Sequence, residues 1–162
     1  MAIGFGIFWF QQTMQTPKIS GTYTGQFTGI GLFTMPVPDW DTNCVFEDDF
    51  SGTMSMNITE AADGSISGTG RLILGWTSTP LSGSTSRFTC LSATPSIDKT
   101  GAVSGTKDNI KFIVQYTSAS GYDAKEEFTG SLSDGEIIGT LVDTSSCCSG
   151  SGIMPVTLTA LQ

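Results

Sequence analysis

Hydrophobic and polar residues alternate along most of this chain. Apolar side chains recur at every second position in 54–58, 72–76, 110–116 and 154–160, with mostly polar or small residues between them. No segment keeps an apolar period of 3.6 residues over three turns, so the pattern indicates strands rather than helices. The sequence therefore predicts an all-β protein in which each strand buries one face.

Eight strands are expected, and turn residues set their ends. Short turns are predicted at 62–65, 98–101 and 133–136, since polar turns containing Gly between alternating runs favour tight hairpins. Counting strand directions then places every short turn at one end and every longer connection at the other. This regularity predicts an eight-stranded antiparallel up-and-down meander barrel. The expected strands are 19–34, 50–60, 65–77, 86–97, 101–117 with a kink at 107–109, 123–132, 136–143 and 153–161.

The barrel is expected to be a single domain over residues 19–162, preceded by an apolar N-terminal segment over 1–18. Residues 2–10 read AIGFGIFWF, without the basic flank of a secretion signal and far short of the ~20 residues of a spanning helix. Three interpretations stay open: a signal remnant, a plug packed on the barrel, or a docking segment for a membrane or a partner. Docking would use Phe5, Phe8, Trp9 and Phe10, together with Trp40 in the first long loop.

Composition and charge narrow the partners and the compartment. The chain has 7 basic and 15 acidic residues and a net charge of −8, which disfavours nucleic acid as a partner. Charged residues make up 14% of the chain, against roughly 25% in an ordinary soluble domain, and Gly, Ser and Thr fill the difference. This balance predicts an extracytoplasmic protein that is periplasmic, secreted or attached to a surface.

The cysteines support the same compartment. Cys44, Cys90, Cys147 and Cys148 are even in number, and the chain has no histidine that would complete a zinc site. All four fall toward the long-loop end, and a bridge between adjacent cysteines strains the intervening peptide. We therefore expect Cys147 and Cys148 to reach Cys44 and Cys90 separately. The alternatives are Cys44 to Cys90 with a vicinal bridge, or four buried free thiols in a cytosolic protein.

Enzyme chemistry is not expected. The absence of histidine removes the commonest general base and triad member. Glu126 and Glu127 are adjacent, as are Asp48 and Asp49, but neighbours in a strand point to opposite faces and make no facing pair. The sequence predicts a protein without a cofactor.

A weak calcium candidate lies in the first long loop. Asp39, Asp41 and Asn43 have the spacing that opens a calcium-binding loop, and Asp48 and Asp49 follow. Cys44 stands where such a loop needs Gly, so an EF-hand is excluded. An irregular calcium site is weighed against an acidic solvated loop pinned by Cys44, and the second interpretation is favoured.

The strand pattern resembles that of the calycin group, the lipocalin and avidin barrels. Ile19-Ser-Gly-Thr-Tyr23 and Asp63-Gly-Ser-Ile-Ser-Gly-Thr69 are similar to the first strands of avidin-like chains. The resemblance implies an eight-stranded meander barrel. It carries no ligand across, because Gly21-Thr22-Tyr23 stands where lipocalins have Gly-x-Trp and the biotin-holding residues of avidins have no matching positions.

Two functions follow as hypotheses. The first is a non-catalytic binding or structural module, an accessory subunit that docks on a protein complex or membrane surface through the N-terminal segment or the loop rim. The second is a carrier of a small apolar ligand in the barrel interior. Bulky inward side chains favour the first. The candidate ligand-facing residues are Trp76, Tyr116, Phe112, Met54 and Met56.

Overall fold

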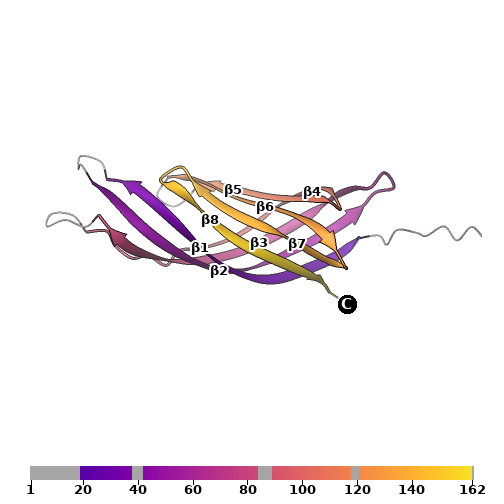
Figure 1. Ribbon diagram of the computed structural model, residues 1–162. Helices are drawn as coiled ribbons and strands as arrows, with labels where there is room; N and C mark the ends of the chain where they lie inside the picture. Colours follow the sequence, from indigo (N-terminus) through magenta and orange to yellow (C-terminus); the bar gives the residue numbers. More distant parts are fainter. Residues whose placement is uncertain (1–18, 38–41, 84–88, 118–120, 162) are drawn as a thin grey trace, which may run out of the picture.

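The computed structural model describes residues 19–37, 42–83, 89–117 and 121–161. In these residues eight antiparallel strands follow one another in chain order, and the last pairs with the first to close a barrel (Figure 1). The predicted all-β, up-and-down fold is confirmed. The strands are β1 (Gly21–Pro36), β2 (Asn43–Glu60), β3 (Ser65–Ser82), β4 (Ser96–Thr106), β5 (Asn109–Thr117), β6 (Asp123–Ser133), β7 (Glu136–Ser145) and β8 (Ser149–Ala160).

Tight hairpins occupy one end of the barrel and longer connections the other. The β6–β7 hairpin turns on Asp134 and Gly135, whose positive φ angles of 52° and 85° suit the two-residue turns that match strand twist. The opposite end carries the β1–β2, β3–β4, β5–β6 and β7–β8 connections, and we call it the mouth. Figure 1 shows the mouth at the left and the C-terminus at the right.

One hairpin lies elsewhere than the sequence predicts. The expected turn at 98–101 belongs to β4, and the expected kink at 107–109 holds the β4–β5 turn. Both runs are polar and turn-like. The first run, however, pairs with β3, and there Asp98 accepts a 2.6 Å ion-pair hydrogen bond from Arg71. Residues 89–95, which were expected to belong to a strand over 86–97, lie in the β3–β4 connection, and 96–97 begin β4.

Large apolar side chains fill the interior along most of the barrel. The inward positions of the described strands pack into one core, as the alternation predicts. Gly70 shows how tight this packing is, since a Cβ there would lie 2.6 Å from the ring of Phe112. The fully buried members include Met54, Met56, Ile58, Leu72, Leu74, Phe112, Phe128, Leu141, Met154 and Leu158.

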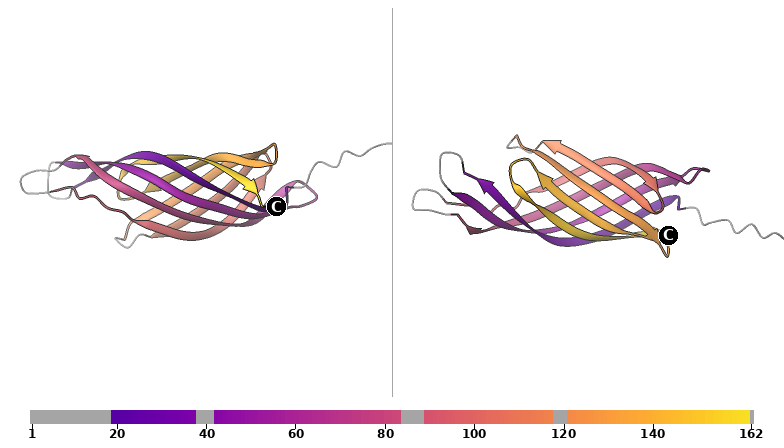
Figure 2. Two further views of the ribbon diagram at one scale, coloured as in Figure 1. Left: turned by 90° about the horizontal axis from the view of Figure 1, so that it is seen from below. Right: turned by 45° about the horizontal axis from the view of Figure 1, so that its top comes forward.

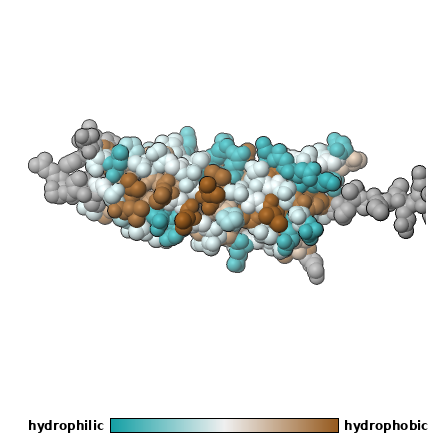
Figure 3. Space-filling view, viewed as in Figure 1, coloured by the Kyte–Doolittle hydropathy of each residue, from teal (hydrophilic) through white to brown (hydrophobic). Residues whose placement is uncertain are grey.

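The outer wall is mainly polar and also carries exposed apolar side chains. Figure 2 shows the strands running obliquely around an elongated body. Figure 3 shows apolar residues gathered on the face over β1, β7 and β8. Ile30 and Ile153, which are cross-strand partners, are 63% and 58% exposed there, and Leu32 lies beside them. The part of the chain that is described holds no helix with the length and apolar character needed to cross a bilayer.

Candidate functional site

Three carboxyl side chains lie in one circumferential row inside the mouth half of the barrel. The register joins Asp48 of β2 to Gly31, Gly31 to Gly152, Gly152 to Asp143 of β7, and Asp143 to Glu126 of β6. Positions in register share one face of a sheet, so all five residues face the interior. We call Asp48, Asp143 and Glu126 the acid layer.

Aromatic rings fill the space above the two glycines of this row. A Cβ on Gly31 would lie 2.8 Å from the ring of Phe33, and one on Gly152 would lie 2.5 Å from the ring of Phe50. Phe50 also packs against Trp76, with ring centroids 6.1 Å apart. Aromatic rings thus border the acid layer. Gly31 of β1 and Gly152 of β8, which have no side chain, leave room for these rings.

Glu126 is the most deeply buried member of the acid layer, with no exposed surface. Tyr116 Oη donates a 3.2 Å hydrogen bond to its Oε1, whereas its Oε2 receives no hydrogen from the described residues. Desolvation, reinforced by the charge of Asp143, raises the pKa of Glu126 to about 9. Glu126 is therefore protonated at neutral pH and is the partner that can donate a hydrogen to Asp143.

The other two carboxyls are shifted in the same direction. Burial raises the pKa of Asp143, and the nearby charge of Asp48 adds to the effect, while the hydrogen bond with Glu126 opposes it. Burial also raises the pKa of Asp48, although Ser78, its partner on β3, hydrogen-bonds to it. Oδ1 of Asp48 is buried and receives no hydrogen from the described chain. The acid layer thus concentrates acceptors with few donors.

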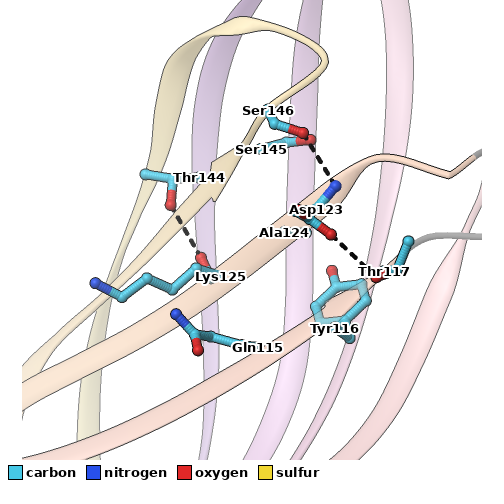
Figure 4. Close-up of a pocket in the computed structure, with 9 residues that line it drawn as sticks. All are labelled: Gln115, Tyr116, Thr117, Asp123, Ala124, Lys125, Thr144, Ser145 and Ser146. Atoms are coloured by element: carbon cyan, nitrogen blue, oxygen red, sulfur yellow. Dashed lines mark hydrogen bonds between the residues drawn. The ribbon is translucent and has the colours of Figure 1, made fainter.

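Tyr116 connects the acid layer to a hollow at the rim. Figure 4 shows Tyr116 beside the ends of β5 and β6 and the β7–β8 connection, where the hollow has a volume of about 580 Å³. Thr117 donates a 3.0 Å hydrogen bond to Asp123, and the amide of Asp123 donates one of 3.0 Å to Ser146, which hold this wall together. The phenol of Tyr116 therefore lies between solvent at the rim and Glu126 below it.

The ladder between β4 and β5 ends before it reaches Tyr116. β4 and β5 pair only from Val103–Phe112 to Thr106–Asn109, and no register pair joins 96–102 to 113–117, although both stretches are described. Continuing the register across the gap would place Lys99 opposite Tyr116. Lys99 Nζ lies 5.7 Å from the centroid of the Tyr116 ring, a cation–π contact across the unpaired stretch of β4 and β5.

The residues that the sequence singled out as ligand-facing separate into two groups. Trp76 and Tyr116 lie in the mouth half, and both are partly buried against the core. Met54, Met56 and Phe112 are fully buried and pack in the filled part of the interior. Outside the described residues lie the predicted docking residues Phe5, Phe8, Trp9, Phe10 and Trp40, and the calcium candidates Asp39 and Asp41.

The described calcium candidates do not converge. Asp48 faces the interior, whereas Asp49, next to it in β2, is exposed on the outer wall, and Asn43 is exposed at the start of the strand. Within the described ranges, no three Cys, Asp or Glu side chains are grouped closely enough to hold a metal ion.

The favoured disulfide pairing is wrong, and the alternative is found. Cys44 bonds to Cys90, with Cα atoms 5.8 Å apart, and Cys147 bonds to Cys148. The physical reason is that the four residues lie in two places at the mouth: Cys44 and Cys90 form a small cluster with Val37, whereas Cys148 packs against the main core. The Cys44–Cys90 bond is consistent with an oxidising, extracytoplasmic environment.

Sequence reasoning missed the acid layer, although a signal for it was present. Adjacent carboxyls do point to opposite faces, as predicted: Glu126 is buried while Glu127 pairs with Lys125 outside. The facing partner of Glu126 is Asp143 on the next strand. The alternation of inward and outward positions along a strand reveals both residues. Glu126 lies two residues from Phe128 and Asp143 lies two residues from Leu141, and both Phe128 and Leu141 are core positions.

Comparison with models of known protein families gives no match to this chain, and comparison with curated proteins gives none either.

Proposed function

We propose that this protein is a non-catalytic binding module and that the mouth of the barrel is its binding end. The observation that carries the proposal is a buried acceptor atom, Oδ1 of Asp48, which receives no hydrogen from the described chain. Buried polar atoms are normally paired, and exceptions concentrate at functional sites. The filled core on the other side of Phe50 leaves the mouth as the end where a ligand fits best.

The chemistry of the acid layer supports binding rather than turnover. Its titratable groups are three carboxyls and a phenol, and burial raises the pKa of Tyr116, which disfavours the phenolate that would act as a base. Glu126 and Asp143 share a proton beneath Tyr116 and are shielded from bulk water. The set accepts hydrogens and positive charge, and it offers no activated nucleophile.

The test is a fragment screen on the ¹⁵N-labelled full chain. A library that contains cationic, neutral and anionic fragments in equal parts is titrated, and amide shifts are mapped. The proposal expects at least one class to shift amides of 114–117, 124–126 and 143–146. Shifts confined to the hairpin end, or to the outer wall over β1 and β8, would overturn the mouth as the binding end.

Docking on a larger complex through the N-terminal segment, the principal hypothesis from the sequence, stays a proposal. It rests on residues 1–18 and is compatible with a ligand site at the mouth, because the described chain begins at the opposite end of the barrel (Figure 1). The extracytoplasmic location is proposed on the same footing as before, from composition together with the Cys44–Cys90 bond.

A further inference from the structure

The acid layer gathers carboxyls without a basic side chain paired to them. In the described part of the chain the ion pairs join Arg71 to Asp98 and Lys125 to Glu127, and neither involves the acid layer. An unpaired buried charge is costly, and a buried carboxyl oxygen without a donor is costly as well. The acid layer therefore favours a ligand that brings positive charge and N–H donors together.

An ammonium group satisfies these needs better than a metal ion. Hard cations such as Ca²⁺ require six to eight converging oxygen ligands, and the described residues hold no such group. An ammonium needs fewer converging oxygens, because one carboxylate and an aromatic face are enough to hold it. The surroundings are also aromatic, since Tyr116 lies above the acid layer and Phe50 and Trp76 border it. Aromatic faces attract organic cations.

We propose that the acid layer binds the ammonium group of a small organic amine, with the apolar part of the amine held against Tyr116 and the rim hollow. This inference rests on the proposed function of the mouth and adds the chemical class of the ligand. Lys99 shows that the site tolerates such a group, because its own ammonium lies over the ring of Tyr116. The route of entry is the unpaired stretch between β4 and β5, and the ring of Tyr116 has to move for the ligand to reach Glu126.

Binding of an amine releases a proton. Glu126 in its acid form and the ammonium R–NH₃⁺ combine to give a carboxylate–ammonium pair, and the proton of the acid passes to the buffer. The O–H bond of Glu126 is the only covalent bond that breaks, and its proton goes to the buffer base. The incoming N–H groups replace that proton as donors to Oε2 of Glu126. A ligand without positive charge gives no such replacement, so proton release distinguishes the proposed mode from apolar binding.

The test compares three probes of one shape: phenethylammonium, 2-phenylethanol and 3-phenylpropanoate. Each is titrated into the full chain by calorimetry in two buffers of different ionisation enthalpy, and amide shifts are recorded in parallel. We expect phenethylammonium alone to bind at the mouth. Its binding enthalpy should differ between the two buffers by an amount that corresponds to the release of up to one proton per amine bound. The neutral and anionic probes are expected to bind at least tenfold more weakly.

Variants with matched controls locate the site. Glu126→Gln and Asp48→Asn each remove one carboxyl group from the acid layer and should weaken phenethylammonium binding about tenfold or more, because the complex then lacks one buried charge-assisted bond. Glu127→Gln and Asp49→Asn remove the neighbouring outward carboxylates and should leave binding within about twofold. Circular dichroism checks that all four variants fold. Glu126→Gln should also abolish proton release.

The outcomes separate this inference from the proposed function. If 2-phenylethanol binds at the mouth as tightly as phenethylammonium, the mouth remains the binding end and the amine class is wrong. If phenethylammonium binds equally well to Glu126→Gln and Glu127→Gln, the acid layer is not the site. If none of the three probes moves an amide at the mouth while other fragments do, only the inference fails.

Discussion

Tyr116 Oη and Glu126 Oε1 are 3.2 Å apart, and the phenol donates its hydrogen to a carboxyl that has no exposed surface. This bond holds the ring of Tyr116 over the acid layer, and Glu126 also hydrogen-bonds to Asp143, its partner in register. A neutral Glu126 satisfies this arrangement, because it accepts from Tyr116 and donates to Asp143. The protonation state of Glu126 is thus coupled to the position of the Tyr116 ring at the mouth.

The first prediction concerns stability and pH. The folded-state pKa of Glu126 is raised above its ordinary value, to about 9, so the folded protein keeps a proton that the unfolded chain loses above about pH 4.5. The free energy of unfolding should therefore be highest below that pH. It should fall by up to about 1.4 kcal/mol per pH unit as the pH rises toward 9. Urea unfolding from pH 4 to 9 measures this slope.

Glu126→Gln should reduce the pH slope and raise stability at pH 8, because the amide stays neutral and still accepts from Tyr116. Asp48 and Asp143 also have raised pKa values, so a smaller slope should remain in this variant. Glu127→Gln is the control, since Lys125 lowers the pKa of this outward-facing carboxyl. A wild-type stability that rises between pH 5 and 8 would contradict the buried acid layer.

The second prediction tests the contact between the acid layer and the core. Gly152→Ala places a Cβ where an atom of the Phe50 ring is 2.5 Å away, so the ring or the backbone of β8 has to move. Overpacking of this kind costs about 1–3 kcal/mol. Gly75→Ala is the matched strand control, because its nearest atoms are 3.9 Å away. Thermal unfolding of the two variants should differ by several degrees, and equal melting temperatures would contradict the packing of Phe50 over Gly152.

The fold was predictable from sequence because period-two alternation and turn parity are local signals that survive in the barrel. The hairpin at 107–108 was misplaced for a related reason: two polar, turn-like runs lie close together, and the choice between them depends on the ladder with β3. Prediction of the acid layer required more information, because its facing pair comes from two strands, β6 and β7, and the register between them has to be known. Parity alone marks Glu126, Asp143 and Asp48 as inward, and the assumption that inward residues are apolar concealed them.

The third prediction concerns the disulfides. Replacing Cys44 and Cys90 together with Ser should lower stability by about 2–5 kcal/mol, because their bond closes a long loop with a sequence separation of 46. Replacing Cys147 and Cys148 together should cost far less, because that bond closes no loop beyond two adjacent residues. Non-reducing peptide mapping checks the connectivity directly. A peptide that links Cys44 to Cys147 or Cys148 would contradict the structure.

The fourth prediction concerns the N-terminal segment. Residues 19–161 close a barrel with a complete core, and Ile19 is buried where its amide donates a 3.2 Å hydrogen bond to Glu60. Deleting residues 1–16 should therefore leave the melting temperature unchanged and abolish association with membranes or partners, which sedimentation of the full chain and the truncated chain would compare. A melting temperature lowered by several degrees would instead identify the segment as a plug.

The last prediction is that Lys99 competes with a ligand at the mouth. Its ammonium lies over Tyr116, where it occupies the approach to the acid layer and repels a second cation. Lys99→Gln should therefore strengthen phenethylammonium binding about threefold to tenfold, chiefly through a faster association rate, and the difference from wild type should shrink in high salt. Lys111→Gln, on β5 and exposed on the outer wall, removes the same charge away from Tyr116 and serves as the control. Stopped-flow binding at two salt concentrations measures both rates. An association rate that Lys99→Gln and Lys111→Gln change equally would show only an effect of net charge, and Lys99 would then have no role in controlling entry.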